Sequence, residues 1–412
     1  MWVFLILIPA LWHGLASGAM GAAEGPVQVT VTGVEGEILK NVQAAVSVPP
    51  GVVTDGGVNT EWLARFERQI PEMAKRALEP FGFYNSQVKV EISVDDKKNH
   101  VIVVAVETGE PVMVTAVEIS IQGPGAQEED LRDLAAAFPL EKGDVLRHDQ
   151  YEKAKAGLKS RAMEGGYPDA EFSVSQILVS RREGAASIKL VLDTGRQYFF
   201  GEVSLEGAEI YPERFLRRYL AFRPGDVYSP SGLGLTQLNL INSDRFKDVI
   251  IIPERDKSEN MRIPVHIKLE PSLPKRLRFG VGYGTDTGAR VTISYKDLNV
   301  SRRGHELDTE LNVSQFKQGL VAGYRIPGDN VDSFTGLSMK LQREDVTTYV
   351  SQQLSFELNR TRGFGPGRIG TAFVRLLRET STVGGQEADA RLVLPGLRFS
   401  GQHYDNLIRP SK

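Results

Sequence analysis

The stretch RLRFGVGYG, residues 276–284, decides the fold of the second half of this chain. Its apolar side chains occupy every second position, and arginines and glycines fill the positions between them. Because successive side chains of a β-strand point to opposite faces, this alternation predicts a strand with one apolar and one polar face. The apolar positions are Leu277, Phe279, Val281 and Tyr283, and the glycines are Gly280, Gly282 and Gly284.

The same alternation recurs from residue 274 to residue 412. We expect about eight strands there, each near the length needed to cross a bilayer at a tilt. An apolar face that alternates with a polar one fits the wall of an outer-membrane β-barrel, and a soluble β-sandwich is the alternative. Besides 276–284, the expected strands lie near 291–295, 305–314, 318–326, 334–342, 354–358, 368–377 and 391–400.

The first half of the chain repeats one plan, with strand, helix, helix, strand and strand in that order. Three short signals recur in the same order, which makes chance similarity improbable. The expected repeats span 24–110, 111–196 and 197–273. The signals are GFY at 82–84, repeated at 166–167 and weakly at 245–246; KGDV at 142–145, repeated as PGDV at 224–227; and VETG at 106–109, repeated as LDTG at 192–195.

Each repeat also carries a predicted helix. In the first repeat we expect a helix from Thr60 that presents Trp62, Phe66 and Ile70 on one face. In the third repeat, Ser229 followed by Pro230 is typical of a helix start, with the hydroxyl as the N-cap. The second repeat is expected to place an apolar stripe on its helix, made of Tyr151, Ala154, Leu158 and Ala162.

Composition limits the function classes. Lys and Arg number 49 against 52 Asp and Glu, a balance that argues against a dedicated nucleic-acid binder. The absence of cysteine excludes disulfides and thiol chemistry. Residues 1–23 are apolar and then small, which predicts a secretory signal peptide, although no basic residue precedes the apolar run. A short anchor helix or a misassigned start codon is the alternative.

Catalytic patterns are weak. Two Asp-Thr-Gly triplets, 193–195 and 286–288, suggest an aspartic-protease dyad, but each is better explained by a repeat signal or a turn. The six histidines do not show metal-ligand spacing, and the glycines of 280–284 lack the helix of a dinucleotide-binding motif. We therefore predict that the protein is not an enzyme and has neither a cofactor nor a metal site.

The repeating unit resembles a POTRA domain, and three such units ahead of a barrel resemble the TamA family of the BamA superfamily. The stretch 33–42 in the first repeat and the stretch 297–307 carry the resemblance. The latter is similar to the superfamily's periplasmic turn between barrel strands two and three, and 324–327 is similar to the next such turn. Three repeats favour TamA, because BamA-like proteins have five and two-partner secretion transporters have two.

The resemblance implies a factor in the outer membrane that inserts client β-barrel proteins, autotransporters among them, with its repeats in the periplasm. It also implies outer-membrane lipids and a TamB-like, inner-membrane-anchored protein as partners. The family barrel has sixteen strands, so the resemblance further suggests a C-terminally truncated reading frame. A POTRA-barrel secretion pore and a periplasmic scaffold are the alternatives.

The predicted site is the first barrel strand, which would form a lateral seam that opens toward a client. Its glycines would weaken side-chain packing along that seam, and relief of crowding in the barrel wall is the alternative explanation for them. The candidate seam residues are Leu277, Phe279, Gly280, Val281, Gly282, Tyr283 and Gly284.

Overall fold

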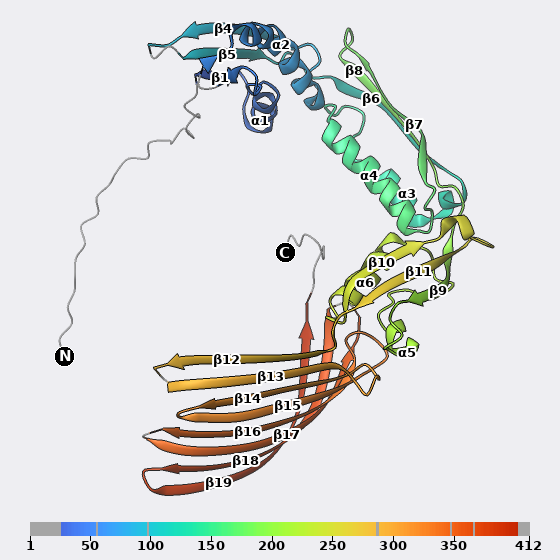
Figure 1. The fold of residues 1–412 in the computed structure, drawn as a ribbon. Helices are drawn as coiled ribbons and strands as arrows, with labels where there is room; N and C mark the ends of the chain where they lie inside the picture. The colour runs from blue at the N-terminus through green and yellow to red at the C-terminus, as the bar shows by residue number, and fades with distance from the viewer. Residues whose placement is uncertain are drawn as a thin grey trace, which may run out of the picture. The chain divides into compact units, whose positions relative to one another are not determined.

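The computed structural model describes residues 26–54, 57–96, 99–285, 288–346, 348–365 and 367–402 (Figure 1). These residues form three small α/β units and one eight-stranded sheet. The chain divides into two compact bodies, and each is described by itself: one holds the first α/β unit and most of the second, and the other holds the third unit and the large sheet. The predicted signal peptide, 1–23, lies outside the described residues.

The first α/β unit is a three-stranded sheet covered by two helices. The strand order is β1-β5-β4, with β1 parallel to β5 and β4 antiparallel to it. Its elements are β1 (Val27–Thr32), α1 (Gly36–Ala45), β2 (Val53–Thr54), β3 (Gly57–Val58), α2 (Thr60–Leu78), η1 (Glu79–Phe81), β4 (Gln87–Val94) and β5 (His100–Glu107).

Helix α2 packs on this sheet through a face that differs slightly from the predicted one. Leu63, Phe66 and Ile70 are buried in the core, whereas Trp62 is 50% exposed. The prediction was right for Phe66 and Ile70 and wrong for Trp62. The helix begins at Thr60, where the side chain of Asn59 accepts a hydrogen bond from the Trp62 amide, so Trp62 lies in the exposed first turn.

The second and third units repeat the plan, with strand orders β6-β8-β7 and β10-β11-β9. The second contains β6 (Met113–Gln122), η2 (Pro124–Gln127), α3 (Glu129–Ala136), α4 (His148–Glu164), β7 (Glu171–Ser180) and β8 (Ala185–Asp193). The third contains β9 (Phe199–Glu206), α5 (Glu213–Arg217), α6 (Pro230–Ile241), β10 (Phe246–Pro253), η3 (Arg255–Lys257) and β11 (Arg262–Pro271).

The recurring Gly-Asp signal forms the same turn in the second and third units. Gly143 and Gly225 both have positive φ, +101° and +93°, a conformation that favours glycine. The Asp144 carboxylate accepts a hydrogen bond from the Glu141 amide at 2.7 Å, and Asp226 accepts one from the Arg223 amide at 2.8 Å. The matching geometry explains why these residue types recur.

The predicted apolar stripe of the second unit and the predicted helix start of the third both appear. Tyr151, Leu158 and Ala162 are buried, and Ala154 is partly buried. Helix α6 begins at Pro230, and the hydroxyl of Ser229 accepts a hydrogen bond from the Gly232 amide at 3.2 Å.

The eight-stranded sheet is antiparallel throughout and keeps the order of the chain, from β12 to β19 (Figure 1). Its strand count agrees with the prediction. Among the described residues, no helix is long and apolar enough to cross a membrane. The strands are β12 (Lys275–Gly284), β13 (Gly288–Val300), β14 (His305–Ser314), β15 (Lys317–Pro327), β16 (Phe334–Val346), β17 (Tyr349–Gly363), β18 (Arg368–Val383) and β19 (Gln386–Gly401).

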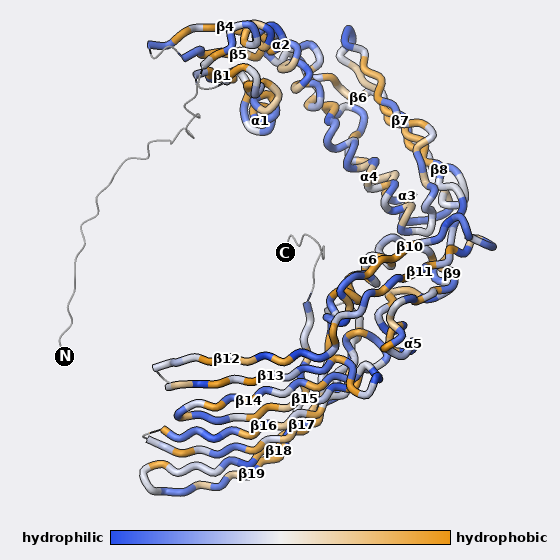
Figure 2. The backbone as a smooth tube through the Cα atoms, viewed as in Figure 1, coloured by the Kyte–Doolittle hydropathy of each residue, from blue (hydrophilic) through white to orange (hydrophobic). Residues whose placement is uncertain are grey.

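The register gives this sheet two different faces. Hydrophobic and hydrophilic residues are mixed along each of its strands (Figure 2). One face carries cross-strand apolar rows, and we call it the apolar face. The other carries a polar row that runs across neighbouring strands and includes an ion pair between Glu357 and Arg375. One apolar row is Ile293, Leu311, Leu320, Leu341 and Leu354, and the polar row is Lys296, Asp308, Gly323, Ser338, Glu357 and Arg375.

Candidate functional site

Strand β12, which holds the predicted seam residues, lies at an edge of the large sheet. It pairs with β13 on one side, and in the part of the chain that the structure describes no strand pairs with its other side. Its apolar side chains are strongly exposed, for example Phe279 at 71% and Val281 at 87%. An edge strand with free backbone groups and a bare apolar face can add a further strand.

Crowding by neighbouring atoms does not explain every glycine of β12. A Cβ on Gly280 would meet its nearest atom, in Thr292, at 3.8 Å, which is ordinary contact. A Cβ on Gly282 would meet the Nε atom of Arg290 at 2.9 Å, and that flexible side chain can move. Gly280 therefore has room for a side chain, which favours the interpretation that glycine weakens packing along this edge.

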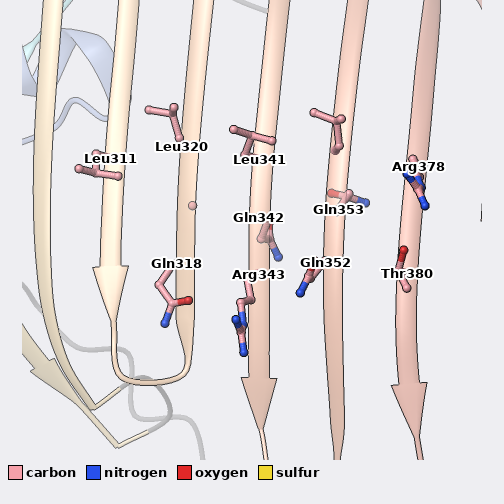
Figure 3. Close-up of a pocket in the computed structure, with 12 residues that line it drawn as sticks. Leu311, Gln318, Leu320, Leu341, Gln342, Arg343, Gln352, Gln353, Arg378 and Thr380 are labelled. Carbon is pink, nitrogen blue, oxygen red and sulfur yellow. The ribbon is translucent and has the colours of Figure 1, made fainter. Parts of the chain in front are cut away.

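The apolar face ends in a polar row toward the hairpins that join β14 to β15 and β16 to β17. Figure 3 shows Leu311, Leu320 and Leu341 across neighbouring strands, and Gln318 and Arg343 beside them. The register places Gln318, Arg343, Gln352 and Thr380 in one cross-strand row two residues beyond the leucines. A polar border to an apolar band is the pattern expected where a membrane-spanning wall leaves the hydrocarbon.

At the opposite end of the strands, the third α/β unit is joined to the sheet by a buried arginine. Arg245, just before β10, is 2% exposed. Its Nη2 donates to the Gly304 carbonyl at 3.0 Å and to Oε1 of Glu306 at 2.9 Å. Glu306 also pairs with Arg325 at 3.0 Å, and the Arg245 guanidinium stacks over the Phe215 ring at 5.0 Å. A charge buried this deeply needs such partners.

The turn that Arg245 reaches joins β13 to β14 and lies in the stretch singled out from the sequence. Asn299 organises this turn: its Oδ1 accepts from the Gly304 amide at 2.8 Å, and its Nδ2 donates to the Ile210 carbonyl at 2.9 Å. Gly304 has φ +73°, and a Cβ there would approach the Phe215 ring to 2.5 Å. The turn is therefore shaped to fit against the third unit.

A second arginine joins the same unit to the next turn on this side of the sheet. Arg218 donates through Nη2 to the carbonyls of Asn330, Val331 and Ser333, at 2.6, 3.1 and 3.1 Å. Burial lowers the pKa of the Arg218 guanidinium and raises the pKa of the neighbouring Tyr219 hydroxyl. These hydrogen bonds hold the segment that follows 324–327, the second turn recognised in the sequence.

The first Asp-Thr-Gly triplet has a structural role. The Thr194 side chain is fully buried; its hydroxyl donates to the Gln122 carbonyl and accepts from the Gly125 amide, both at 3.1 Å. Asp286 and Thr287 of the second triplet lie outside the described residues. Within those residues, no group of three or more His, Asp or Glu side chains is arranged to hold a metal ion.

Sequence reasoning missed Arg245 and Arg218, because their partners lie 59 to 115 residues away along the chain. One signal was available for Arg245. Arg245 stands where the first two repeats have the glycine of the glycine-aromatic motif, so the third repeat replaces a glycine with a charged residue there.

Comparison with known families identifies two of the α/β units. Residues 28–108 match the family described as POTRA domain TamA domain 1, and residues 198–272 match the POTRA family described as surface antigen variable number repeat. The first and third units are therefore POTRA domains, and the second has the same strand order.

Comparison with individual proteins agrees. The chain is 22% identical over 157 residues to the outer membrane protein assembly factor BamA of Buchnera aphidicola, and the aligned region covers 38% of this chain and 25% of that protein. It is 21% identical over 206 residues to a putative outer membrane protein assembly factor of Treponema pallidum, and the aligned region covers 48% of this chain and 24% of that protein. The chain thus spans about a quarter of the length of these curated relatives.

The fold is also similar to a crystal structure of BamA from Haemophilus ducreyi lacking POTRA domains 1–3, with a TM-score of 0.54 and 14% identity. That likeness covers 72% of this chain and 61% of the other. The molecule is thus a set of POTRA-like units followed by part of a barrel. Two of its α/β units match POTRA families, and the fold of much of the chain is similar to that of BamA.

Proposed function

We propose that this chain contributes the periplasmic repeats and the first barrel strands of a TamA-type outer-membrane assembly factor, which inserts client β-barrel proteins such as autotransporters. In this proposal the protein is non-enzymatic. The observation that carries it is the exposed edge strand β12, at the start of a barrel-like sheet that follows POTRA units. Two relatives named as assembly factors support the general role. The match of 28–108 to TamA domain 1 supports the TamA type.

The proposed mechanism is strand addition. An unfolded client strand would pair with the free backbone of β12, since an unpaired edge is a template for another strand. The exposed side chains of Leu277, Phe279, Val281 and Tyr283 would lie against lipid or client. Gly280 and Gly282 would leave the seam poorly packed, so that it separates at low cost.

The repeats would bind extended client segments by the same strand addition. The strands β4, β7 and β10 each lie at the outer edge of their three-stranded sheets. On β4, Ile92 and Val94 are exposed beside the free edge. We propose that these edges receive clients, and that the first unit receives a TamB-like partner anchored in the inner membrane.

Cysteine crosslinking of the protein during client assembly tests the role of β12. This chain contains no cysteine, so a single cysteine at Phe279 or Tyr283 is unique within it. We expect disulfide or bismaleimide crosslinks to a client strand during assembly. The matched control is a cysteine at Leu337 on the interior strand β16, which is also exposed on the apolar face and should not trap client. Capture of only the protein's own last strand would refute strand addition.

A further inference from the structure

A pocket rich in arginine lies where the third α/β unit meets the large sheet. Its volume is about 470 Å³, which is within the range of small-ligand pockets. The lining includes Arg214, Arg217 and Arg218 from the region of α5, and Arg303 from the turn between β13 and β14. Asp329 is the one carboxylate among the lining residues.

The positive charge in this pocket is only partly neutralised. Arg217 pairs with Glu213 at 2.7 Å. Arg214 and Asp329 are 3.7 Å apart and 95% and 92% exposed, so water weakens their attraction. Among the described residues, Arg303 has no carboxylate within ion-pair distance. The lining thus holds four guanidinium groups and one carboxylate, and Glu213 pairs with one of the four, so the pocket keeps a net positive charge suited to an anion.

The pocket opens on the apolar face of the sheet. His305 lines it, and alternation along β14 puts His305 on the same face as Leu307 and Leu311. The His305 Nδ1 atom lies 2.7 Å from the Tyr324 hydroxyl, and Tyr324 pairs with Leu337 across the strands on this face. Glu306, one residue on, points to the opposite face and to Arg245.

The pocket also lies at the end of the apolar band. Ile326 is exposed on the apolar face, and the next two residues, Pro327 and Gly328, line the pocket. If the apolar face contacts lipid, guanidinium groups at its border stand at the level of the phosphates of the periplasmic leaflet. Arginine forks bind phosphate oxygens in pairs, and basic pockets at a membrane border bind lipid head groups.

We propose that this junction pocket binds the phosphate of an anionic phospholipid in the periplasmic leaflet of the outer membrane. Arg214, from the third α/β unit, and Arg303, from a turn of the sheet, both line the pocket and would contact the phosphate. A bound lipid then stabilises the contact between the two parts. The inference rests on the proposed membrane crossing of the sheet, and it does not depend on the client-templating role of β12.

Native mass spectrometry of the protein in detergent tests this proposal. The probes are phosphatidylglycerol, phosphatidylcholine and inorganic phosphate. We expect phosphatidylglycerol to bind more tightly than phosphatidylcholine, whose choline cation the arginines repel. The double variant R214Q/R303Q should weaken phosphatidylglycerol binding roughly tenfold. The variant R214K/R303K retains the charge but loses the paired donors, so its affinity should lie between those of the unchanged protein and R214Q/R303Q.

The matched control is R223Q/K268Q, which removes two exposed charges from the same unit outside the pocket. It should bind phosphatidylglycerol like the unchanged protein. Equal affinity of the pocket and control variants for phosphatidylglycerol would overturn the proposal. So would binding of inorganic phosphate without binding of phosphatidylglycerol, which would show that a free anion is the ligand. Crosslinking at β12 can succeed or fail independently, so the two proposals are separable.

Discussion

At the scale of single residues, Gly304 combines two requirements that can be separated by mutation. Its φ of +73° strains any other residue, and Phe215 fills the space where a Cβ would lie. Gly225 has φ +93°, but a Cβ there would meet nothing within 4 Å. Both glycines thus have a backbone conformation that is strained for other residues, but only Gly304 lies where a Cβ would clash with a neighbour.

We therefore predict that G304A lowers the free energy of unfolding more than G225A does. Backbone strain should cost about 1–2 kcal/mol in both variants, and the clash with Phe215 should add about 1–3 kcal/mol in G304A alone. Urea denaturation followed by circular dichroism measures the free energy of unfolding of both variants. The double variant G304A/F215L should recover part of the extra loss. Equal losses in G304A and G225A would show that Phe215 can shift freely.

Residue-scale contacts were also the least predictable part of the molecule. The sequence stretch 297–307 could be recognised as a turn, but nothing local indicated that Arg245 would be buried against Glu306. Charged side chains are usually exposed, and only tertiary structure supplies the partners that allow burial. Trp62 was misplaced for a related reason, since its exposure depends on where the helix begins.

At the scale of elements, prediction worked well because periodicity is a local property. The eight strands β12–β19 and the order of elements in the repeats follow from alternation, helical spacing and recurring turn signals. The candidate site divides in the same way. The edge strand β12 could be located from its own residues, whereas the arginine pocket could not, because Arg214 and Arg303 meet only after folding.

Helix α6 offers a prediction at this scale, because it leads into Arg245. The Ser229 hydroxyl caps its first turn through the Gly232 amide at 3.2 Å. S229A should destabilise the third unit by about 1 kcal/mol, since an unsatisfied helix amide remains. S229T keeps the capping oxygen and serves as the control. Hydrogen exchange of the α6 amides measures the difference. Indistinguishable exchange in S229A and S229T would mean that the cap contributes nothing.

At the scale of the molecule, the third α/β unit and the large sheet belong to one compact body. Arg245 and Arg218 each donate from the α/β unit to a turn of the sheet, and Asn299 donates in the other direction. Because these contacts lie on two neighbouring turns at this end of the sheet, β13–β14 and β15–β16, the unit should not pivot freely about its connection to β12. A displacement of the third unit should therefore also move the turn between β13 and β14.

This coupling predicts that R245M loosens the junction without unfolding the sheet. Glu306 is 19% exposed and keeps its ion pair with Arg325 at 3.0 Å. The free energy of unfolding should therefore fall by about 3 kcal/mol, the lower limit for a broken buried pair. Hydrogen exchange should rise in the turn 300–304, whereas strands β17 and β18 should retain their protection. R378M, which breaks an exposed pair with Asp389, is the control and should change little. If R245M and R378M exchange alike at 300–304, the buried arginine does not hold the two parts together, and the turn must be held by Asn299 and Phe215 alone.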